Sequence, residues 1–258
     1  MAAPPEAVCL DVGWTLIYPR ASMWELFAAV GREAGADLTA EQGETLVHGV
    51  MTARREQSVT EFEAGTQYGD SDAEFVAQFG LMGRLLFALA SVPGDHAALA
   101  ERFMARFWTA ENWAVYPDVL AGLERLRARG VRAGVLSNAS SDLLALLDST
   151  GILPLCDFTV VSAIEGTKKP DRRIFERALD RAGAPPERTV HVGDMYVEDI
   201  LGARQVGIRP LLMERGALSM FPHHPESDNH APGTVEVVRD FGDVLAAIGI
   251  EDGARGGR

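Results

Sequence analysis

The sequence contains little cysteine and no long apolar run. Two of its 258 residues are cysteines, Cys9 in an apolar stretch and Cys156 in a turn-like stretch. That number argues against a disulfide framework and against a cysteine-based zinc site, so we expect two reduced thiols. No stretch approaches the roughly 18 uncharged apolar residues of a membrane-spanning helix. Residues 1–6 lack the basic start and apolar core of a signal peptide. These absences predict a soluble, cytoplasmic protein without a membrane partner.

Positive charge is also scarce. The chain has 24 basic and 37 acidic residues, which gives a formal net charge of -13. This balance disfavours non-specific binding to nucleic acid, and it gives no long-range attraction for an anionic substrate. Any phosphate group would therefore need positive groups close at hand.

Among the basic residues, lysine is the rarer kind, since 22 of the 24 are arginines. The two lysines, Lys168 and Lys169, are adjacent and stand directly before Pro170. A general preference for arginine explains the background but not this pairing. The compact ammonium group of lysine differs chemically from a forked guanidinium, so the pair is a candidate functional site.

The first feature that is present is a helical segment early in the chain. Asp72 and Asp95 are typical N-terminal capping residues within it. We predict an α-helical bundle that forms a cap domain over residues 18–111, inserted into a core domain made of residues 1–17 and 112–258. Apolar residues recur at helical spacing in Met23–Val30, Leu46–Met51, Phe75–Ala90 and Leu99–Trp108.

Beyond residue 116 helices and short strands alternate. This alternation predicts βαβ units and an α/β fold with a doubly wound parallel sheet, which the strand before Asp11 joins across the insertion. Residues 219–233 are expected to form an exposed loop, and residues 253–258 a disordered tail. Strands are expected at Val131–Leu136, Phe158–Ser162, Thr189–Val192, Pro210–Met213 and Val235–Val238. Helices are expected at Leu120–Leu126, Leu143–Leu147, Arg172–Ala182 and Val244–Ile248. A further helix is expected to follow the strand Thr189–Val192 and to end at Val206.

A carboxylate stands at the end of the first predicted strand. The apolar stretch Ala7–Leu10 is followed by Asp11, then by Gly13 and Thr15. Open α/β sheets bind their ligands at the carboxyl ends of their strands, so Asp11 is expected in the site. A carboxylate there can attack phosphorus, attack carbon, or bind a metal.

Three other positions along the predicted sheet carry polar groups. Ser137 and Asn138 follow a strand, where a hydroxyl and free backbone N–H groups can hold an oxyanion; a turn or cap is the plainer alternative. Lys169 places an ammonium at the start of a helix. Asp194 and Asp199 flank a strand-to-helix turn, as a hard cation such as Mg²⁺ requires, although one of them alone would serve as a helix cap.

Together, in this order, these residues resemble the haloacid dehalogenase-like superfamily of hydrolases, over nearly the whole chain. The resemblance implies a Rossmann-like core with its site under a helical cap, and a nucleophilic Asp11. It implies that Ser137 binds the phosphate and that Lys169 neutralises the nucleophile and the transferring group. It also implies that Asp194 and Asp199 hold Mg²⁺.

One position departs from the family's phosphatases, which carry a second Asp two residues after the nucleophile. Here that residue is Gly13. The resemblance implies that the backbone carbonyl at this position still binds Mg²⁺. The missing acid and base should slow the hydrolysis of alkyl phosphates by about 10²- to 10⁴-fold. We therefore expect acetyl phosphate or aryl phosphates to be better substrates than sugar phosphates.

Three functions follow from this pattern. The favoured one is a Mg²⁺-dependent phosphatase that acts on a small phosphorylated metabolite through an aspartyl-phosphate at Asp11. The second is a 2-haloacid dehalogenase, which also lacks the second Asp but does not use the metal-type turn of Asp194 and Asp199. The third is a protein that binds phosphoryl ligands without turnover. The sequence predicts neither the substrate nor the oligomeric state.

Several other residues invite a role. His191 is interpreted as a packed strand residue, and Trp14 as a wall of the cleft or part of the core. A metal site made of His223, His224, Asp228 and His230 is disfavoured because these residues lack helical or strand spacing. Candidate contributors from the cap are Tyr18, Arg20, Trp24, Arg54 and Arg55.

Overall fold

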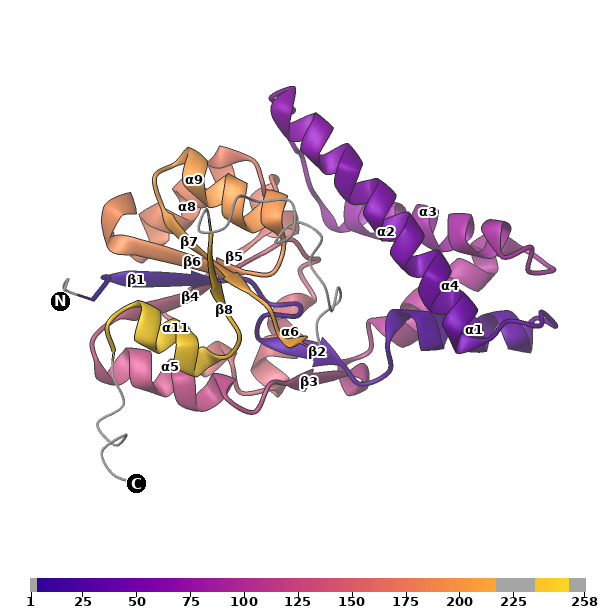
Figure 1. Ribbon diagram of the computed structural model, residues 1–258, viewed down its shortest axis with the longest axis horizontal. Coiled ribbons are helices and arrows are strands. Elements are labelled where there is room, and N and C mark those ends of the chain that lie inside the picture. Colours follow the sequence, from indigo (N-terminus) through magenta and orange to yellow (C-terminus); the bar gives the residue numbers. More distant parts are fainter. Residues whose placement is uncertain (1–3, 217–234, 251–258) are drawn as a thin grey trace.

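The computed structural model describes residues 4–216 and 235–250. Its centre is a six-stranded parallel sheet with the order β5-β4-β1-β6-β7-β8 (Figure 1). The order places β1 between β4 and β6, so segments far apart in the sequence become neighbours. The strands are β1 (Ala7–Leu10), β4 (Arg132–Ser137), β5 (Phe158–Val161), β6 (Thr189–Gly193), β7 (Arg209–Met213) and β8 (Glu236–Val238).

Helices cover both faces of this sheet, with α8 and α9 on one side and α5 and α11 on the other (Figure 1). A strand covered on both faces needs apolar side chains at every position rather than at alternate ones. All four residues of β1 are accordingly buried. Val8 and Leu10 belong to the cluster with α5, whereas Ala7 and Cys9 pack with α8. The helices are α5 (Val119–Ala128), α6 (Leu143–Ser149), α7 (Ser162–Glu165), α8 (Arg172–Ala182), α9 (Gly202–Gln205) and α11 (Phe241–Ala247).

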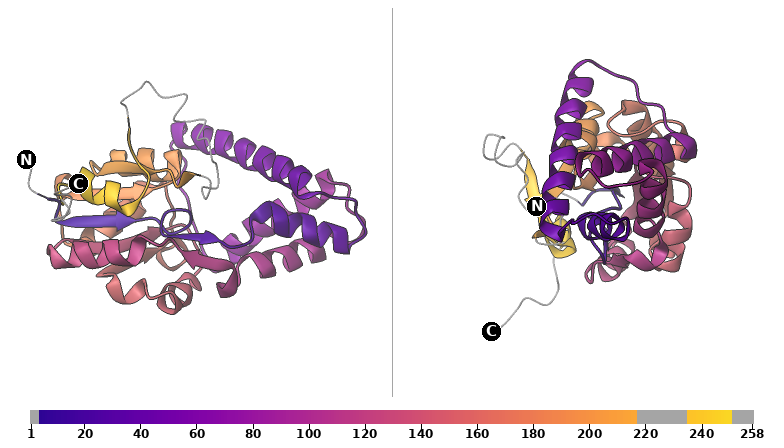
Figure 2. Two further views of the ribbon diagram at one scale, coloured as in Figure 1. Left: turned by 60° about the horizontal axis from the view of Figure 1, so that its bottom comes forward. Right: turned by 90° about the vertical axis from the view of Figure 1, so that its right-hand side faces the viewer.

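Four α-helices lie between residues 20 and 110 and stand to one side of the sheet (Figures 1 and 2). They are α1 (Met23–Glu33), α2 (Ala40–Glu63), α3 (Asp72–Leu89) and α4 (His96–Phe107), and we call residues 23–107 the helical segment. Their packing is aromatic: the ring of Phe27 lies 4.9 Å from that of Phe87 and 6.3 Å from that of Phe103. That these residues act as a cap domain stays a proposal.

The chain enters and leaves the helical segment through two short strands that pair with each other. β2 (Ile17–Pro19) and β3 (Trp113–Val115) are antiparallel, with Tyr18 opposite Ala114. Sequence analysis missed both strands, because three residues are too few to establish an alternating pattern. The expected boundary between residues 17 and 18 lies inside β2.

The parallel α/β sheet confirms the predicted fold class, while some details differ. The N-terminal cap of α3 is Ser71, whose hydroxyl accepts a hydrogen bond from the backbone of Glu74, so the expectation for Asp72 was wrong. Asp95 does cap α4. The helix expected to end at Val206 begins as a π-helix, Tyr196–Leu201, before α9.

Some expectations fall outside the described residues: the loop at 219–233, the tail at 253–258, and the four residues of the disfavoured metal site. Within residues 4–216 and 235–250, no helix is both long and apolar enough to span a membrane.

Candidate active site

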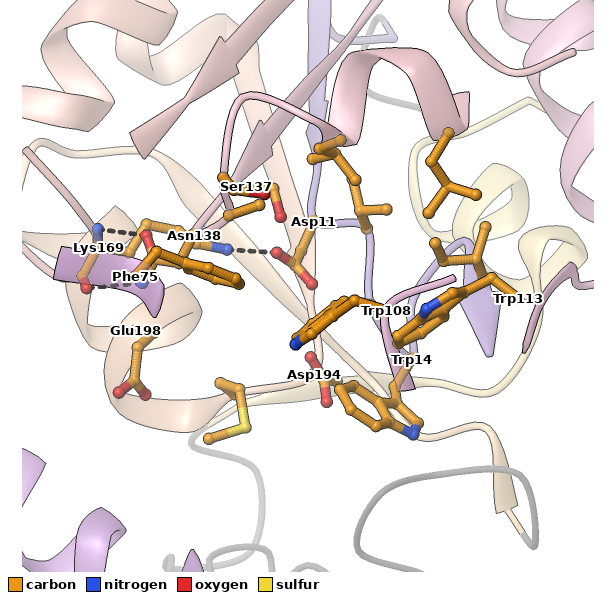
Figure 3. Close-up of a pocket in the computed structure, with 18 of the residues that line it drawn as sticks. Asp11, Trp14, Phe75, Trp108, Trp113, Ser137, Asn138, Lys169, Asp194 and Glu198 are labelled. Carbon is orange, nitrogen blue, oxygen red and sulfur yellow. Dashed lines mark hydrogen bonds and ion pairs between the residues drawn. The ribbon is translucent and has the colours of Figure 1, made fainter. Parts of the chain in front are cut away.

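Residues from three adjacent strand ends meet at one edge of the sheet. Asp11 follows β1, Ser137 ends β4, and Asp194 follows β6. All three line a cavity of about 260 Å³ between this edge and the helical segment, together with Lys169 and Asp199 (Figure 3). The sheet order explains the convergence, because β4 and β6 are the two neighbours of β1.

Lys169 joins two of the carboxylates. Its Nζ donates hydrogen bonds to Asp11 Oδ1 and to Asp199 Oδ1, both at 2.6 Å. The lysine side chain is 2% exposed. Burial by itself would lower the pKa of Lys169, but the charges of Asp11 and Asp199 outweigh it and raise that pKa. The lysine is therefore a stable cation inside the site.

Asp199 has partners on both carboxylate oxygens. Oδ1 lies 2.9 Å from His191 Nε2, and Oδ2 accepts a hydrogen bond from the backbone of Met195 at 2.9 Å. Burial would raise the pKa of Asp199, but Lys169 and His191 hold it well below its usual range. A Cβ at Gly193 would lie 2.2 Å from the Asp199 carboxyl carbon, so glycine permits this close approach.

Three buried carboxylates form a group that a cation fits. Oxygen atoms of Asp11, Asp194 and Asp199 all lie within 4.8 Å of one another. Burial raises the pKa of Asp11, although Lys169 opposes that rise, and burial with repulsion from Asp11 and Asp199 raises the pKa of Asp194 well above its ordinary value. One ammonium does not neutralise three carboxylates, and oxygen ligands of this kind suit Mg²⁺.

Asn138 lies beside the lysine rather than free in the cavity. Its Oδ1 accepts a hydrogen bond from Lys169 N at 2.8 Å, and its Nδ2 donates one to Lys169 O at 2.9 Å. Ser137 is 5% exposed and lines the cavity near Asp11 (Figure 3). Of this pair, the serine side chain is the one placed to meet a ligand.

Gly13 also lines the cavity, two residues after Asp11. A Cβ at this position would meet nothing within 4 Å apart from its chain neighbours. A Cβ, the first atom of any longer side chain, can therefore be placed here without a clash.

The second lysine of the pair lies elsewhere. Lys168 and Arg54 line an adjoining cavity of about 160 Å³, which shares Asn138 and Lys169 with the first. Burial lowers the pKa of Lys168, an effect that the nearby charge of Asp70 opposes. Of the two lysines, the one that reaches Asp11 is Lys169.

The helical side of the cavity differs from expectation. None of the five candidates predicted there lines it. Tyr18 packs on Tyr116 with ring centroids 4.7 Å apart, Trp24 packs on His48 at 5.3 Å, and Arg54 pairs with Glu61 at 3.3 Å. Arg20 is exposed and Arg55 is buried. The lining comes instead from Met23, Met51, Phe75 and Phe79 of the helical segment, from Trp108 directly after it, and from Trp113 of β3.

Trp14 forms another wall of the cavity. Its φ of 52° lies in the left-handed region, which is unfavourable for a bulky residue. Its N–H donates to Ile17 O at 2.7 Å, which holds the tight turn after the nucleophile. Such strain is maintained only where the surroundings impose it, and here the residue lines the cavity that also contains Asp11.

Side chains of the helical segment also form hydrogen bonds with residues of the part of the chain that contains the sheet. Asp72 accepts two hydrogen bonds from Ser141, from its N and its Oγ, both at 2.7 Å. Ser58 donates to Glu198 at 3.1 Å. Glu198 lines the cavity, and burial raises its pKa. Sequence analysis missed Glu198, because an acidic residue next to Asp199 gives no separate signal.

Comparison with known proteins places the chain among relatives of one kind. The family model of the haloacid dehalogenase-like hydrolases matches residues 7–207. The haloacid dehalogenase-like hydrolase domain-containing protein 3 of Danio rerio is 33% identical over 217 residues, which cover 83% of this chain and 87% of that protein. A phosphoserine phosphatase of Thermus thermophilus is 34% identical over 130 residues, which cover 50% of each chain.

Solved structures share the fold. The putative HAD-hydrolase YfnB of Bacillus subtilis, described as bound to magnesium, superposes with a TM-score of 0.70 at 18% identity. The match covers 96% of this chain and 100% of that chain. At this identity the likeness establishes the shared fold.

Proposed function

The chain belongs to the haloacid dehalogenase-like hydrolases, and from that premise we propose that it is a Mg²⁺-dependent phosphatase of small phosphorylated molecules. The observation that carries the proposal is the group of three buried carboxylates around Lys169. The phosphatase among the relatives supports the same reaction class.

In this proposal Asp11, Asp194 and the Gly13 carbonyl would hold Mg²⁺. Asp199 lies in the same group, but Lys169, His191 and Met195 already occupy its oxygens. It therefore holds the lysine in place and completes the negative charge around the metal. When bound, Mg²⁺ would neutralise part of the charge on the phosphoryl group.

The reaction then has two steps. Asp11 attacks the phosphorus, the bond to the leaving oxygen breaks, and an aspartyl-phosphate forms. Water attacks that phosphorus, inorganic phosphate leaves, and the Asp11 carboxylate is restored. Lys169 favours the ionised, nucleophilic form of Asp11, and the Ser137 hydroxyl donates to a phosphoryl oxygen.

The position of Gly13 sets the limit of this chemistry. With no carboxylic acid there to protonate the leaving oxygen, departure depends on how well the leaving group carries negative charge. We therefore propose that acetyl phosphate and other phosphates with good leaving groups are hydrolysed faster than sugar phosphates.

The decisive experiment is hydrolysis of acetyl phosphate with Mg²⁺ or with EDTA, by the unmodified protein and by Asp11→Asn. We expect activity that needs both Mg²⁺ and Asp11. Activity that survives EDTA or Asp11→Asn would refute the phosphatase. Chloride release from a 2-chloro acid would indicate the dehalogenase, and phosphate binding without turnover would indicate a binding protein.

A further inference from the structure

The cavity above the nucleophile is walled by aromatic rings. Three of the four tryptophans in the chain line it. The rings of Trp108 and Trp113 are stacked, with centroids 5.3 Å apart and planes at 17°. The Trp113 ring also contacts that of Trp14, with centroids 5.7 Å apart, and the Trp108 ring contacts that of Phe79, with centroids 5.3 Å apart. We call Trp14, Phe75, Phe79, Trp108 and Trp113, which all line the cavity, the aromatic wall. Figure 3 labels four of these residues, all but Phe79.

Part of this wall is open rather than packed into a core. Trp108 is 37% exposed, and Phe79 is half-buried. The one polar atom of the Trp113 ring already donates to Phe107 O at 3.1 Å, so this ring offers the cavity an apolar surface. Aromatic faces and edges of this kind bind flat apolar groups by stacking and by edge contacts.

The charges of the cavity exclude a second anionic group. Among the described residues that line it, Lys169 is the one basic side chain, and two carboxylates already share it. Asp142 and Glu198 add acidic rather than basic side chains to the lining. In the adjoining cavity Arg54 is paired with Glu61. A carboxylate on the leaving group would therefore find no free cation among the described residues of this cavity, since Lys168 lines the adjoining one.

The size of the cavity limits the leaving group. Its volume of about 260 Å³ lies just below the roughly 300 Å³ at which ligand pockets commonly begin. A single ring fits this space better than a nucleoside or a long chain.

We propose that the substrate is a phosphate monoester whose leaving group is small, uncharged and aromatic, and that the aromatic wall selects it. The proposal rests on the phosphatase chemistry proposed above for the transfer step. The wall recognises the leaving group, while Asp11, Lys169 and Mg²⁺ act on the phosphoryl group.

The test compares alkyl phosphates, so that acidity of the leaving alcohol does not imitate recognition. The values of kcat/KM are measured for benzyl phosphate, glycerol phosphate and phosphoglycolate, with acetyl phosphate as the reference for the phosphoryl chemistry. We expect benzyl phosphate to exceed both other esters by about 10-fold, which is the order of one aromatic pair contact. Equal values, or a preference for phosphoglycolate, would overturn the proposal.

Variants locate the preference. Trp108→Ala should lower the ratio of benzyl to acetyl phosphate activity by about 10-fold, and Phe79→Leu by about 3-fold. Trp24→Ala is the matched control, because Trp24 packs on His48 outside the cavity and should leave that ratio as it was. A ratio that neither cavity variant changes would refute the role of the wall.

The two proposals fail separately. If acetyl phosphate is not hydrolysed, the phosphatase chemistry is wrong, and the wall is then judged by binding. In calorimetry with Mg²⁺, benzyl phosphate should still bind about 10-fold more tightly than glycerol phosphate. Equal binding would overturn the wall as well.

Discussion

The side chain of Asn138 brackets the backbone of Lys169, accepting from its N at 2.8 Å and donating to its O at 2.9 Å. The two residues lie 31 positions apart, so the contact ties the end of β4 to the loop before α8. It uses both polar atoms of the amide. We infer that Asn138 acts by holding Lys169 in place against Asp11 and Asp199.

Removing this bracket should slow turnover more than it weakens binding. In Asn138→Ala the lysine backbone loses two hydrogen bonds, and a small displacement of a positioned group lowers kcat by about 10- to 100-fold. Steady-state kinetics on acetyl phosphate should show this fall with little change in KM. The variant Asn138→Asp keeps the acceptor and loses the donor, so its kcat should lie between that of the unmodified protein and that of Asn138→Ala. A pure rise in KM would instead indicate that Asn138 binds the substrate.

The sequence sufficed to predict that polar residues from several strand ends would converge, because parallel strands end at one edge of their sheet. It also sufficed for α8, whose predicted and observed bounds are both Arg172–Ala182. It did not reveal that His191 contacts Asp199. A buried strand histidine looks like any packed residue, and the contact spans eight positions that carry no regular spacing.

Apart from Trp14, which the sequence analysis offered as a wall of the cleft, the aromatic wall was missed for a related reason. Phe75 and Phe79 are four residues apart on α3, which is the spacing of any helix face that packs into a core. Periodicity identifies the apolar face but not what covers it. Only the tertiary arrangement shows that this face lines the cavity that contains Asp11.

Stability should depend on pH and Mg²⁺ together. The folded pKa values of Asp11 and Asp194 are raised, so the folded state binds more protons than the unfolded chain above about pH 4. This contribution is full below that pH and is lost as pH rises through the raised values. The depressed pKa of Asp199 acts in the opposite sense, but only below about pH 4.

Without metal, Tm should therefore fall as the pH rises above about 4, and Mg²⁺ should restore more of it at higher pH. Each kcal/mol of this coupling shifts Tm by about 2–4 °C in a chain of this size. Thermal unfolding with EDTA and with Mg²⁺ measures both effects. In Asp194→Asn the dependence on pH and on Mg²⁺ should shrink. A Mg²⁺ effect of equal size at low and at high pH would contradict this explanation.

The contact between Asp72 and Ser141 should influence how tightly substrates are enclosed. Ser141 donates twice to Asp72, and these bonds lower the pKa of the Asp72 carboxyl. Because the pair is exposed, Asp72→Ala should cost little stability. It should raise KM for benzyl phosphate by about 2- to 5-fold, since the loss of a hydrogen bond to a charged group is partly offset by water. The control is Asp37→Ala, at an exposed position of the helical segment. An equal rise in KM in that variant would mean that the contact between Asp72 and Ser141 does not influence substrate binding.

Restoring the missing carboxylate at Gly13 is the sharpest test of what limits turnover. A Cβ there meets no neighbour within 4 Å, and the φ of Gly13 is not in the left-handed region, so a side chain can begin there without a clash at Cβ or backbone strain. Gly13→Asp supplies a proton donor two residues from the nucleophile, which should raise kcat on benzyl phosphate by about 10²-fold. Acetyl phosphate should gain much less, because its leaving group needs no proton. Gly13→Asn matches the size without the acid, so an equal gain in that variant would mean that bulk, rather than proton transfer, had been missing.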